Sequence, residues 1–255
     1  MSTGILMDID GTLQARGTVI PGAVEAVSEL RAGGFRLRLL TNTDAKTPET
    51  IRQTLLGYGL KVAADELFTP AVAAQHLCTR PGVRAYTLVA PAIAGMLPAA
   101  PAPGPYTHVI VGDCSATLNY TLLDEAFRAL RAGATLVALQ RGRYYRAADG
   151  DHLDTGAIVA ALEYAAGVQA EVLGKPSTDF FTMAAGSLGL APADCLVVGD
   201  DATTDIAGGR AAGLRTVQVR TGKYADQQAE ALPTVADHTI DSVADLPALL
   251  RAPAQ

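Results

Sequence analysis

Two carboxylates separated by one residue stand near the start of the chain, directly after a short apolar run. The run Gly4-Ile5-Leu6-Met7 ends in Asp8-Ile9-Asp10-Gly11-Thr12. Paired carboxylates favour a hard cation such as Mg²⁺, because oxygen atoms are its preferred ligands and its charge offsets their repulsion. Beside a cation, one carboxylate can act as a nucleophile and the other as a general acid and base. Gly11 permits a turn and lets a backbone N–H approach an anionic group.

Other polar residues also follow apolar runs. Thr41-Asn42-Thr43 comes after Leu37–Leu40, and Gly199-Asp200-Asp201 comes after Cys195–Val198. Ligands of open parallel sheets bind outside the carboxyl ends of the strands. We therefore expect these residues to converge with Asp8 and Asp10 at one edge of a sheet.

The elements that must position these residues alternate between strand and helix. Helical spacing of apolar residues begins at Pro21 and stops at Gly33-Gly34, and Thr47-Pro48 is typical of a second helix start. Towards the carboxyl end, the pattern predicts a helix over 179–188 and strands over 195–198 and 216–219. This rhythm predicts an α/β fold whose core is a doubly wound, Rossmann-like parallel sheet.

A different stretch separates the two halves of this pattern. Residues 81–105 are rich in Ala, Pro and Gly, which alone is typical of a linker. Two more alternations follow, and they predict strands over 109–111 and 135–139 and helices over 121–131 and 155–166. We therefore expect an inserted α/β cap domain over 81–171 and a core domain made of 1–80 and 172–255.

Composition excludes several classes of protein. The 255 residues carry 20 basic and 26 acidic side chains, a net charge of −6, which argues against nucleic acid as a partner. With 49% hydrophobic and 18% charged residues, the chain can bury a core. We predict a cytoplasmic protein with no membrane partner, because neither a signal peptide nor a stretch of about 20 apolar residues is present. The three cysteines and four histidines lack metal-ligand spacing.

Taken in order, four motifs resemble those of the haloacid dehalogenase superfamily of phosphatases. They are Asp8-Ile9-Asp10-Gly11-Thr12-Leu13, Thr41-Asn42, Gly174-Lys175-Pro176-Ser177, and Gly199-Asp200 with Asp205. The resemblance covers essentially the whole chain, and the insertion after Thr41 is similar to the nitrophenyl-phosphatase-like branch with a large α/β cap.

Four further strings resemble the subgroup that contains phospholysine phosphohistidine inorganic pyrophosphate phosphatase: Gly142–Tyr145, Ala161–Ala165, Glu171–Ser177 and Val219–Tyr224. Gln140–Arg143 departs from the nitrophenyl-phosphatase pattern, which puts the substrates of that group in doubt.

The resemblance implies a role for each catalytic residue. Asp8 would attack phosphorus and become an aspartyl phosphate. Asp10 would protonate the leaving group and then activate water. Lys175 would neutralise the charge that grows on Asp8 and the phosphate. Thr41, with Gly11 and the backbone amides near Asn42 and Thr43, would bind the phosphoryl group.

The resemblance also implies a Mg²⁺ site. Asp8, the main-chain carbonyl of Asp10, and Asp200 would bind the ion. Asp205 would belong to the same metal site as a residue that supports these ligands from behind, and Asp201 is a further candidate for that role; whether either carboxylate contacts the ion directly stays open at this point.

Simpler structural roles exist for most of these residues. Asp8 and Asp10 are also typical of a turn, Thr41 of a turn cap and Lys175 of a solvated surface. Asp201 and Asp205 are also typical of acids at a helix N-terminus. In the insertion, Arg143 with its two following tyrosines would line the substrate site or pack at a domain edge, and 113–115 is a second candidate loop.

The sequence therefore predicts a Mg²⁺-dependent phosphatase that acts on a small phosphorylated metabolite. Asp10 favours phosphate hydrolysis over dehalogenation, because a halide leaving group needs no proton. One alternative is a pyrophosphatase or a hydrolase of phosphoramidates such as phospholysine and phosphohistidine. Another, of a different class, is a receiver-like phosphoacceptor signalling domain, which the Asp10 carboxylate and the large insertion oppose. By analogy we also expect a homodimer through the cap.

Overall fold

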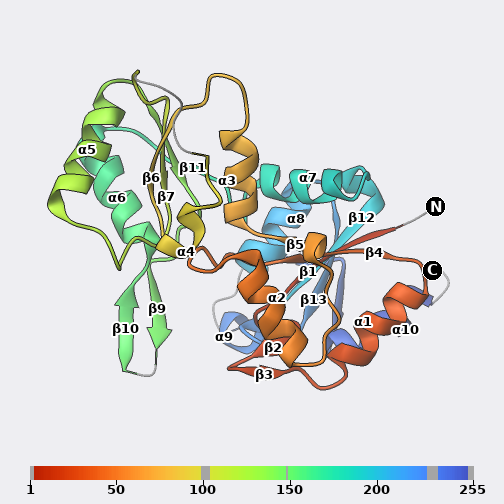
Figure 1. Cartoon of the computed structure of the whole chain (residues 1–255). Helices are drawn as coiled ribbons and strands as arrows, with labels where there is room; N and C mark the ends of the chain where they lie inside the picture. The colour runs from red at the N-terminus through yellow and green to blue at the C-terminus, as the bar shows by residue number, and fades with distance from the viewer. Residues whose placement is uncertain (1–2, 99–103, 148, 229–234, 252–255) are drawn as a thin grey trace. The chain divides into compact units, whose positions relative to one another are not determined.

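The computed structural model describes the backbone of residues 3–98, 104–147, 149–228 and 235–251 (Figure 1). The chain forms two compact units. The first comprises Met1–Thr41, Pro48–Phe68 and Lys175–Gln255, and the second comprises Asn42–Thr47 and Thr69–Gly174. The units thus divide at other positions than the expected domains 1–80 with 172–255 and 81–171. In particular, helix α3 (Pro70–Cys78) clusters with the second unit.

The first unit is built on a parallel sheet in the order β14-β13-β12-β1-β4-β5. Its central strands are short apolar runs with buried side chains, as expected for strands covered on both faces. The strands are β1 (Gly4–Asp8), β4 (Arg36–Leu40), β5 (Leu67–Phe68), β12 (Cys195–Gly199), β13 (Arg215–Val219) and β14 (His238–Ile240). The predicted α/β class is confirmed.

Helices lie on both sides of this sheet (Figure 1). Ile5 and Met7 of β1 pack in one apolar cluster with α1 residues Val27 and Leu30. The helices are α1 (Ala23–Ala32), α2 (Pro48–Gly57), α7 (Thr178–Ser187), α8 (Ala207–Ala211), α9 (Tyr224–Gln228) and α10 (Leu246–Arg251). Shorter elements are β2 (Gln14–Ala15), β3 (Thr18–Val19), and the turns η1 (Ala64–Glu66), η2 (Pro192–Asp194), η3 (Ala202–Ile206) and η4 (Val243–Asp245).

The register of the sheet brings the predicted motifs to one edge. Asp8 pairs with Leu40, so Thr41 begins directly beside the end of β1. Met7 pairs with Val198, so Asp200 follows on the other side of the same strand. The doubly wound topology thus places three motifs at neighbouring carboxyl ends.

The second unit has its own parallel sheet, in the order β11-β8-β7-β6. Val109 and Ile110 point to opposite faces and enter two different apolar clusters, one on each side of the sheet. The strands are β6 (Ala85–Leu88), β7 (His108–Val111), β8 (Thr135–Ala138) and β11 (Glu171–Val172). The other elements are α3, α4 (Pro91–Ala94), α5 (Tyr120–Arg131), α6 (Thr155–Ala166) and a hairpin of β9 (Tyr144–Ala147) and β10 (Gly150–Leu153).

The expected inserted domain therefore has more structure than the sequence predicts. The Ala/Pro/Gly-rich stretch contains β6 and α4, while its residues 99–103 lie outside the described residues. The hairpin β9–β10 pairs antiparallel and was not predicted. No helix among the described residues is long and apolar enough to cross a bilayer.

A buried carboxylate holds part of the second unit together. The Oδ2 atom of Asp44 accepts hydrogen bonds from the backbone N–H of Asp113 at 3.0 Å and from the hydroxyl of Thr155 at 2.7 Å. The residue is only 5% exposed. Burial raises the pKa of Asp44 to about 6, opposed by the Thr155 hydrogen bond and reinforced by the Asp154 and Asp113 charges.

Asp44→Asn is expected to stabilise the protein at pH 8 but not at pH 4. The native pKa of about 6 lies above the ordinary value of 3.8, so the unfolded chain loses this proton first. The native state therefore loses stability as pH rises between these values, and the cost is complete above the native pKa. A shift of this size corresponds to at most about 3 kcal/mol in the free energy of unfolding.

Urea unfolding of both proteins at the two pH values measures this effect. Asp65→Asn, which removes an exposed carboxylate, is the charge-matched control. An Asp44→Asn protein that is less stable than wild type at pH 8 would contradict the assignment.

Candidate active site

Lys175 is the centre of a buried ionic cluster in the first unit. Its Nζ atom donates to Asp8 Oδ1 at 2.5 Å and to Asp205 Oδ1 at 2.7 Å. The three residues are 5%, 3% and 1% exposed, respectively. Although burial alone would lower the pKa of Lys175, the Asp205 and Asp8 carboxylates raise it above its usual range. Lys175 is therefore a permanent cation rather than a solvated surface residue.

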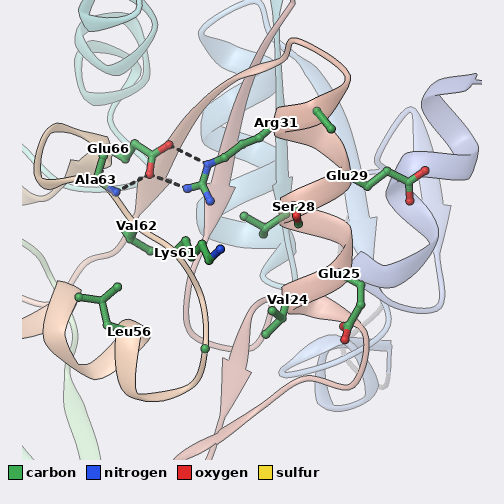
Figure 2. Close-up of a pocket in the computed structure, with 13 residues that line it drawn as sticks. Val24, Glu25, Ser28, Glu29, Arg31, Leu56, Lys61, Val62, Ala63 and Glu66 are labelled. Atoms are coloured by element: carbon green, nitrogen blue, oxygen red, sulfur yellow. Dashed lines mark hydrogen bonds and ion pairs between the residues drawn. The ribbon is translucent and has the colours of Figure 1, made fainter.

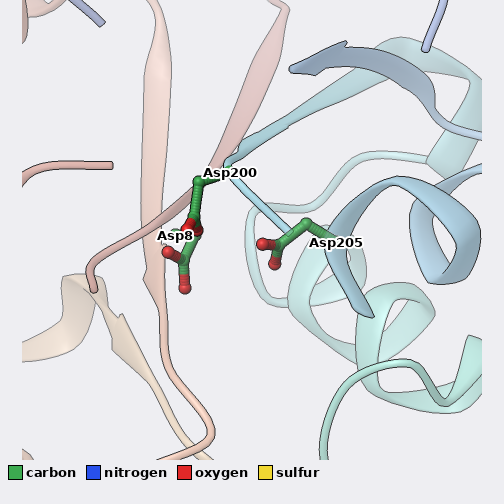
Figure 3. A group of neighbouring side chains, drawn as sticks. All are labelled: Asp8, Asp200 and Asp205. Carbon is green, nitrogen blue, oxygen red and sulfur yellow. The ribbon is translucent and has the colours of Figure 1, made fainter. Parts of the chain in front are cut away.

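Three carboxylates gather around this lysine. Oxygen atoms of Asp8, Asp200 and Asp205 lie within 4.8 Å of one another, and all three side chains are buried (Figure 3). Burial raises the pKa of Asp8 to about 7; Lys175 opposes this rise and the Asp200 charge adds to it. Burial and then the Asp205 charge raise the pKa of Asp200 to about 6. Such a cluster needs more positive charge than one ammonium supplies.

Burial, together with the Asp8 charge, also raises the pKa of Asp205 to about 7, although Lys175 opposes it. Its other oxygen, Oδ2, accepts a hydrogen bond from the backbone N–H of Asp201 at 3.3 Å. Asp205 lies in the π-helical turn η3, whose position next to β12 aims its carboxylate at the cluster. Close packing of this turn on β12 requires Gly199, since an added Cβ there would overlap Asp205.

Asp201 is adjacent to Asp200 but is not among the three clustered carboxylates, and its side chain has other partners. One oxygen of its side chain accepts hydrogen bonds from the backbone N–H groups of Thr203 and Thr204, which caps η3. The other binds Lys223 Nζ at 2.8 Å. Against the effect of burial, the charge and hydrogen bond of Lys223, with hydrogen bonds from the side chains of Thr203 and Gln227, hold the pKa of Asp201 well below its usual range. The two neighbouring aspartates therefore have different environments, and Asp201 shapes the turn.

The turn after β1 presents Asp10 differently from Asp8. Asp10 is exposed, and its Oδ2 atom accepts a hydrogen bond from the Thr41 hydroxyl at 3.4 Å. The amide of Gln14 donates to its other oxygen. Gly11 adopts a φ of +94°, and an added Cβ would overlap the Asp200 carboxylate. An exposed carboxyl group that is held at two points can exchange protons with a bound molecule.

The structure thus brings together most of the predicted site residues. Those that share the first unit are Asp8, Asp10, Gly11, Thr41, Lys175, Asp200 and Asp205. Asn42, Thr43 and Arg143 belong to the second unit, and Arg143 is exposed. Their roles in phosphate or substrate binding stay predictions.

A segment without an assigned role in the sequence, Thr221–Lys223, completes the site. The Thr221 hydroxyl donates to the carbonyl oxygen of Gly11 at 2.5 Å. The backbone N–H of Lys223 donates to Asp200 Oδ2 at 2.7 Å. Gly222 has a φ of +60°, and an added Cβ would overlap the Asp200 carboxylate and crowd Gly11. The sequence signal for this segment is a glycine close after a buried strand, β13.

A separate groove of about 830 Å³ lies elsewhere on the first unit (Figure 2). Its lining comes from α1, α2 and η1 and includes Val24, Leu56 and Val62. The ion pair of Arg31 with Glu66 spans one side. None of the clustered carboxylates lines this groove, so the groove is separate from the cluster.

Comparisons with known proteins agree with this arrangement. A family model described as haloacid dehalogenase-like hydrolase matches residues 5–100, and a HAD-hydrolase-like model matches residues 172–246. The chain is 35% identical to a phospholysine phosphohistidine inorganic pyrophosphate phosphatase of Xenopus laevis, over 94% of this chain and 91% of that protein. It is 34% identical to haloacid dehalogenase-like hydrolase domain-containing protein 2 of Bos taurus, over 92% and 95% of the two chains.

Solved structures show the same fold. A p-nitrophenyl phosphatase from Archaeoglobus fulgidus superposes with a TM-score of 0.87 at 27% identity, covering 97% of this chain and 99% of that one. A glycerol phosphate phosphatase from Mycobacterium tuberculosis, solved in complex with calcium, superposes with a TM-score of 0.82 at 28% identity. It covers 96% of this chain and 74% of that one.

Gly222→Ala is expected to weaken divalent-cation binding about tenfold or more, because the new methyl group displaces the Asp200 carboxylate from its position. Calorimetric titration with Mg²⁺ or Mn²⁺ measures the affinity. Gly213→Ala is the matched control: Gly213 has a φ of +83°, but nothing lies within 4 Å of an added Cβ. Equal cation affinities of the two variants would show that Gly222 does not position Asp200.

Proposed function

Because the chain belongs to the haloacid dehalogenase-like hydrolases and is a phosphatase, we propose that it hydrolyses a small phosphorylated metabolite through an aspartyl phosphate on Asp8, with Mg²⁺ as cofactor. The observation that carries this proposal is the ion pair of Asp8 with Lys175 inside the buried carboxylate cluster. A carboxylate that is buried and paired with a fixed cation is held in one orientation, as a nucleophile requires.

The residues of the cluster fit a divalent cation. When ionised, Asp8, Asp200 and Asp205 carry three negative charges, and Lys175 contributes one positive charge. The remaining charge of −2 and the oxygen-only donor set suit Mg²⁺. Asp8, Asp200 and Asp205, with the main-chain carbonyl of Asp10, would hold it. When bound, the ion would offset the negative charge of the transferring phosphoryl group.

In the first step, an Asp8 oxygen attacks phosphorus, so the Asp8 O–P bond forms while the bond to the leaving-group oxygen breaks. Asp10 gives its proton to that oxygen. Thr41, whose hydroxyl contacts Asp10, orients this carboxyl group. Lys175 stays charged throughout and stabilises the negative charge on Asp8 and the phosphoryl oxygens.

In the second step, Asp10, now a carboxylate, accepts a proton from a water molecule that attacks the same phosphorus. The Asp8 O–P bond breaks, and inorganic phosphate leaves. Both steps use one residue as acid and then as base, which restores the enzyme. The exposure of Asp10, in contrast to the burial of Asp8, supports this division of roles.

A second candidate is hydrolysis of pyrophosphate or of phosphoramidates. The relatives named phospholysine phosphohistidine inorganic pyrophosphate phosphatase favour it. The same residues would carry out the reaction, because only the leaving group differs: a phosphate oxygen leaves from pyrophosphate, and a nitrogen leaves from a phosphoramidate. A receiver-like signalling domain is disfavoured, since the chain matches hydrolases over almost its whole length. A homodimer through the cap and a cytoplasmic location stay predictions, and light scattering of the purified protein tests the first.

Phosphate release from a panel of compounds tests the proposal. Wild type with Mg²⁺ is expected to release phosphate from 4-nitrophenyl phosphate, and comparison with pyrophosphate and phosphoramidate distinguishes the two candidates. Asp8→Asn removes the nucleophile and is expected to leave less than about 1% of the activity. Asp10→Asn removes the acid and base and is expected to lower kcat about 10² to 10⁴-fold.

Asp194→Asn, which neutralises an exposed carboxylate, is the matched control and is expected to behave as wild type. Release that persists in Asp8→Asn, or that does not respond to removal of divalent cations, would contradict the mechanism.

A further inference from the structure

The chain crosses between the two units directly beside residues of the proposed site. Thr41 ends the first stretch of unit one, and Asn42 already belongs to unit two. Gly174 ends unit two, and Lys175 returns the chain to unit one. Both boundaries therefore fall on peptide bonds next to residues that the proposed mechanism uses.

The segment Asn42–Thr47 is short, yet it clusters with the second unit. After it, the chain goes back to the first unit at Pro48, where α2 begins. A short segment that clusters with the second unit needs specific contacts there, because a loop without such contacts would cluster with the strand and helix on either side of it.

Asp44 provides that attachment. Its carboxylate accepts hydrogen bonds from Asp113, which follows β7, and from Thr155, the first residue of α6. Both donors stand at the carboxyl edge of the parallel sheet of the second unit. Sheets of this type bind ligands at that edge. Here, a side chain from the segment that follows Thr41 occupies the position of a ligand.

The second crossing packs against the first within the same unit. Gly174 lies so close to the side chain of Asn42 that an added Cβ would come within 2.7 Å of Asn42 Oδ1 and 2.5 Å of the Leu139 carbonyl oxygen. Asn42 and Gly174 are thus held together at the sheet edge that Asp44 reaches.

The negative charge of Asp44 lowers the stability of the native state. The carboxylate is buried near the charges of Asp154 and Asp113, and its raised pKa shows that the ionised form is disfavoured in the native state. An asparagine has a carbonyl oxygen that can accept both hydrogen bonds without this cost. The hydrogen-bonded position of the segment, rather than the charge, is therefore what matters at this site.

We propose that Asp44 is a positioning residue for phosphate binding: it attaches the backbone amides of Asn42 and Thr43 to the second unit, while Thr41 stays with the first. This inference rests on the proposed function, and on the role in phosphoryl binding that the family resemblance implies for these amides. Release of the Asp44 attachment would lose the placement of the two amides.

Four variants test this inference. Asp44→Ala removes the acceptor and Thr155→Val removes the hydroxyl donor, whereas Asp44→Asn and Thr155→Ser keep them. Thr216→Val is the matched control in the first unit, since the buried Thr216 hydroxyl also donates to an aspartate, Asp237, at the amino end of β13. Two quantities are measured: hydrogen exchange of the amides in 42–47, and the inhibition constant of inorganic phosphate together with KM and kcat.

In Asp44→Ala and Thr155→Val, we expect faster hydrogen exchange of the amides in 42–47. We also expect KM and the phosphate inhibition constant to rise about tenfold, which is the effect of losing one buried hydrogen bond. The change in kcat should be smaller. Asp44→Asn, Thr155→Ser and Thr216→Val are expected to match wild type in phosphate affinity and KM, and none of them to exchange faster in 42–47. If Asp44→Ala does not fold, Thr155→Val carries the test.

Unchanged hydrogen exchange in Thr155→Val and Asp44→Ala would show that Asp44 does not attach the segment 42–47. Faster exchange with unchanged phosphate affinity would show that the attachment has no role in phosphate binding. A wild-type protein that releases phosphate from no substrate would instead contradict the proposed function. In that case, calorimetric binding of inorganic phosphate replaces the kinetic constants and still distinguishes the variants.

Discussion

Three buried carboxylates beside one ammonium, which bonds two of them, set the constraint on which this site depends. Asp8 ends β1, whereas Asp200 and Asp205 follow β12, and oxygen atoms of the three lie within a few ångströms of one another. Isolated charges of this kind would be neutralised by protonation, which is what their raised pKa values express. Lys175 compensates for one charge. When all three carboxylates are ionised, two negative charges are left over, and this excess is the basis for proposing that the cluster holds a divalent cation.

Much of the first unit serves to hold this unfavourable arrangement together. The parallel sheet brings the ends of β1, β4 and β12 side by side. Three glycines let the backbone approach the carboxylates: Gly11 and Gly222 lie against Asp200, and Gly199 lies against Asp205. Asp201 differs from these carboxylates, because the charge of Lys223 and hydrogen bonds from Lys223, Thr203 and Gln227 side chains keep its pKa low.

The sequence predicts the parts of this structure that depend on local pattern. Apolar runs that stop at Asp8, Thr41 and Asp200 predict buried strands, and parallel strands of one sheet must bring those residues to one edge. The roles of Asp201 and Asp205 could not be separated in this way, since both follow β12 and the turn η3 alone decides which one enters the cluster.

Other features depend on contacts between distant residues. Asp44 is an ordinary turn residue in the sequence, and its partners lie 69 and 111 positions away. The contact of Lys223 with Asp200 is made by a backbone N–H, which no residue type signals. The division between the units lies near Thr69 rather than residue 81, because α3 buries Ala71 and Ala74 against the second sheet. Periodicity predicts a helix but not the sheet that it covers.

The most direct test of the central claim is the thermal stability of the protein as a function of Mg²⁺ concentration, at constant ionic strength. If the carboxylate cluster is a cation site, Mg²⁺ stabilises wild type by about 2.7 kcal/mol at a concentration one hundred times its Kd. The same titration should leave Asp200→Asn nearly unchanged, and this variant should be the more stable protein without the ion. A wild-type Tm that ignores Mg²⁺, or an equal increase in Asp200→Asn, would contradict the account.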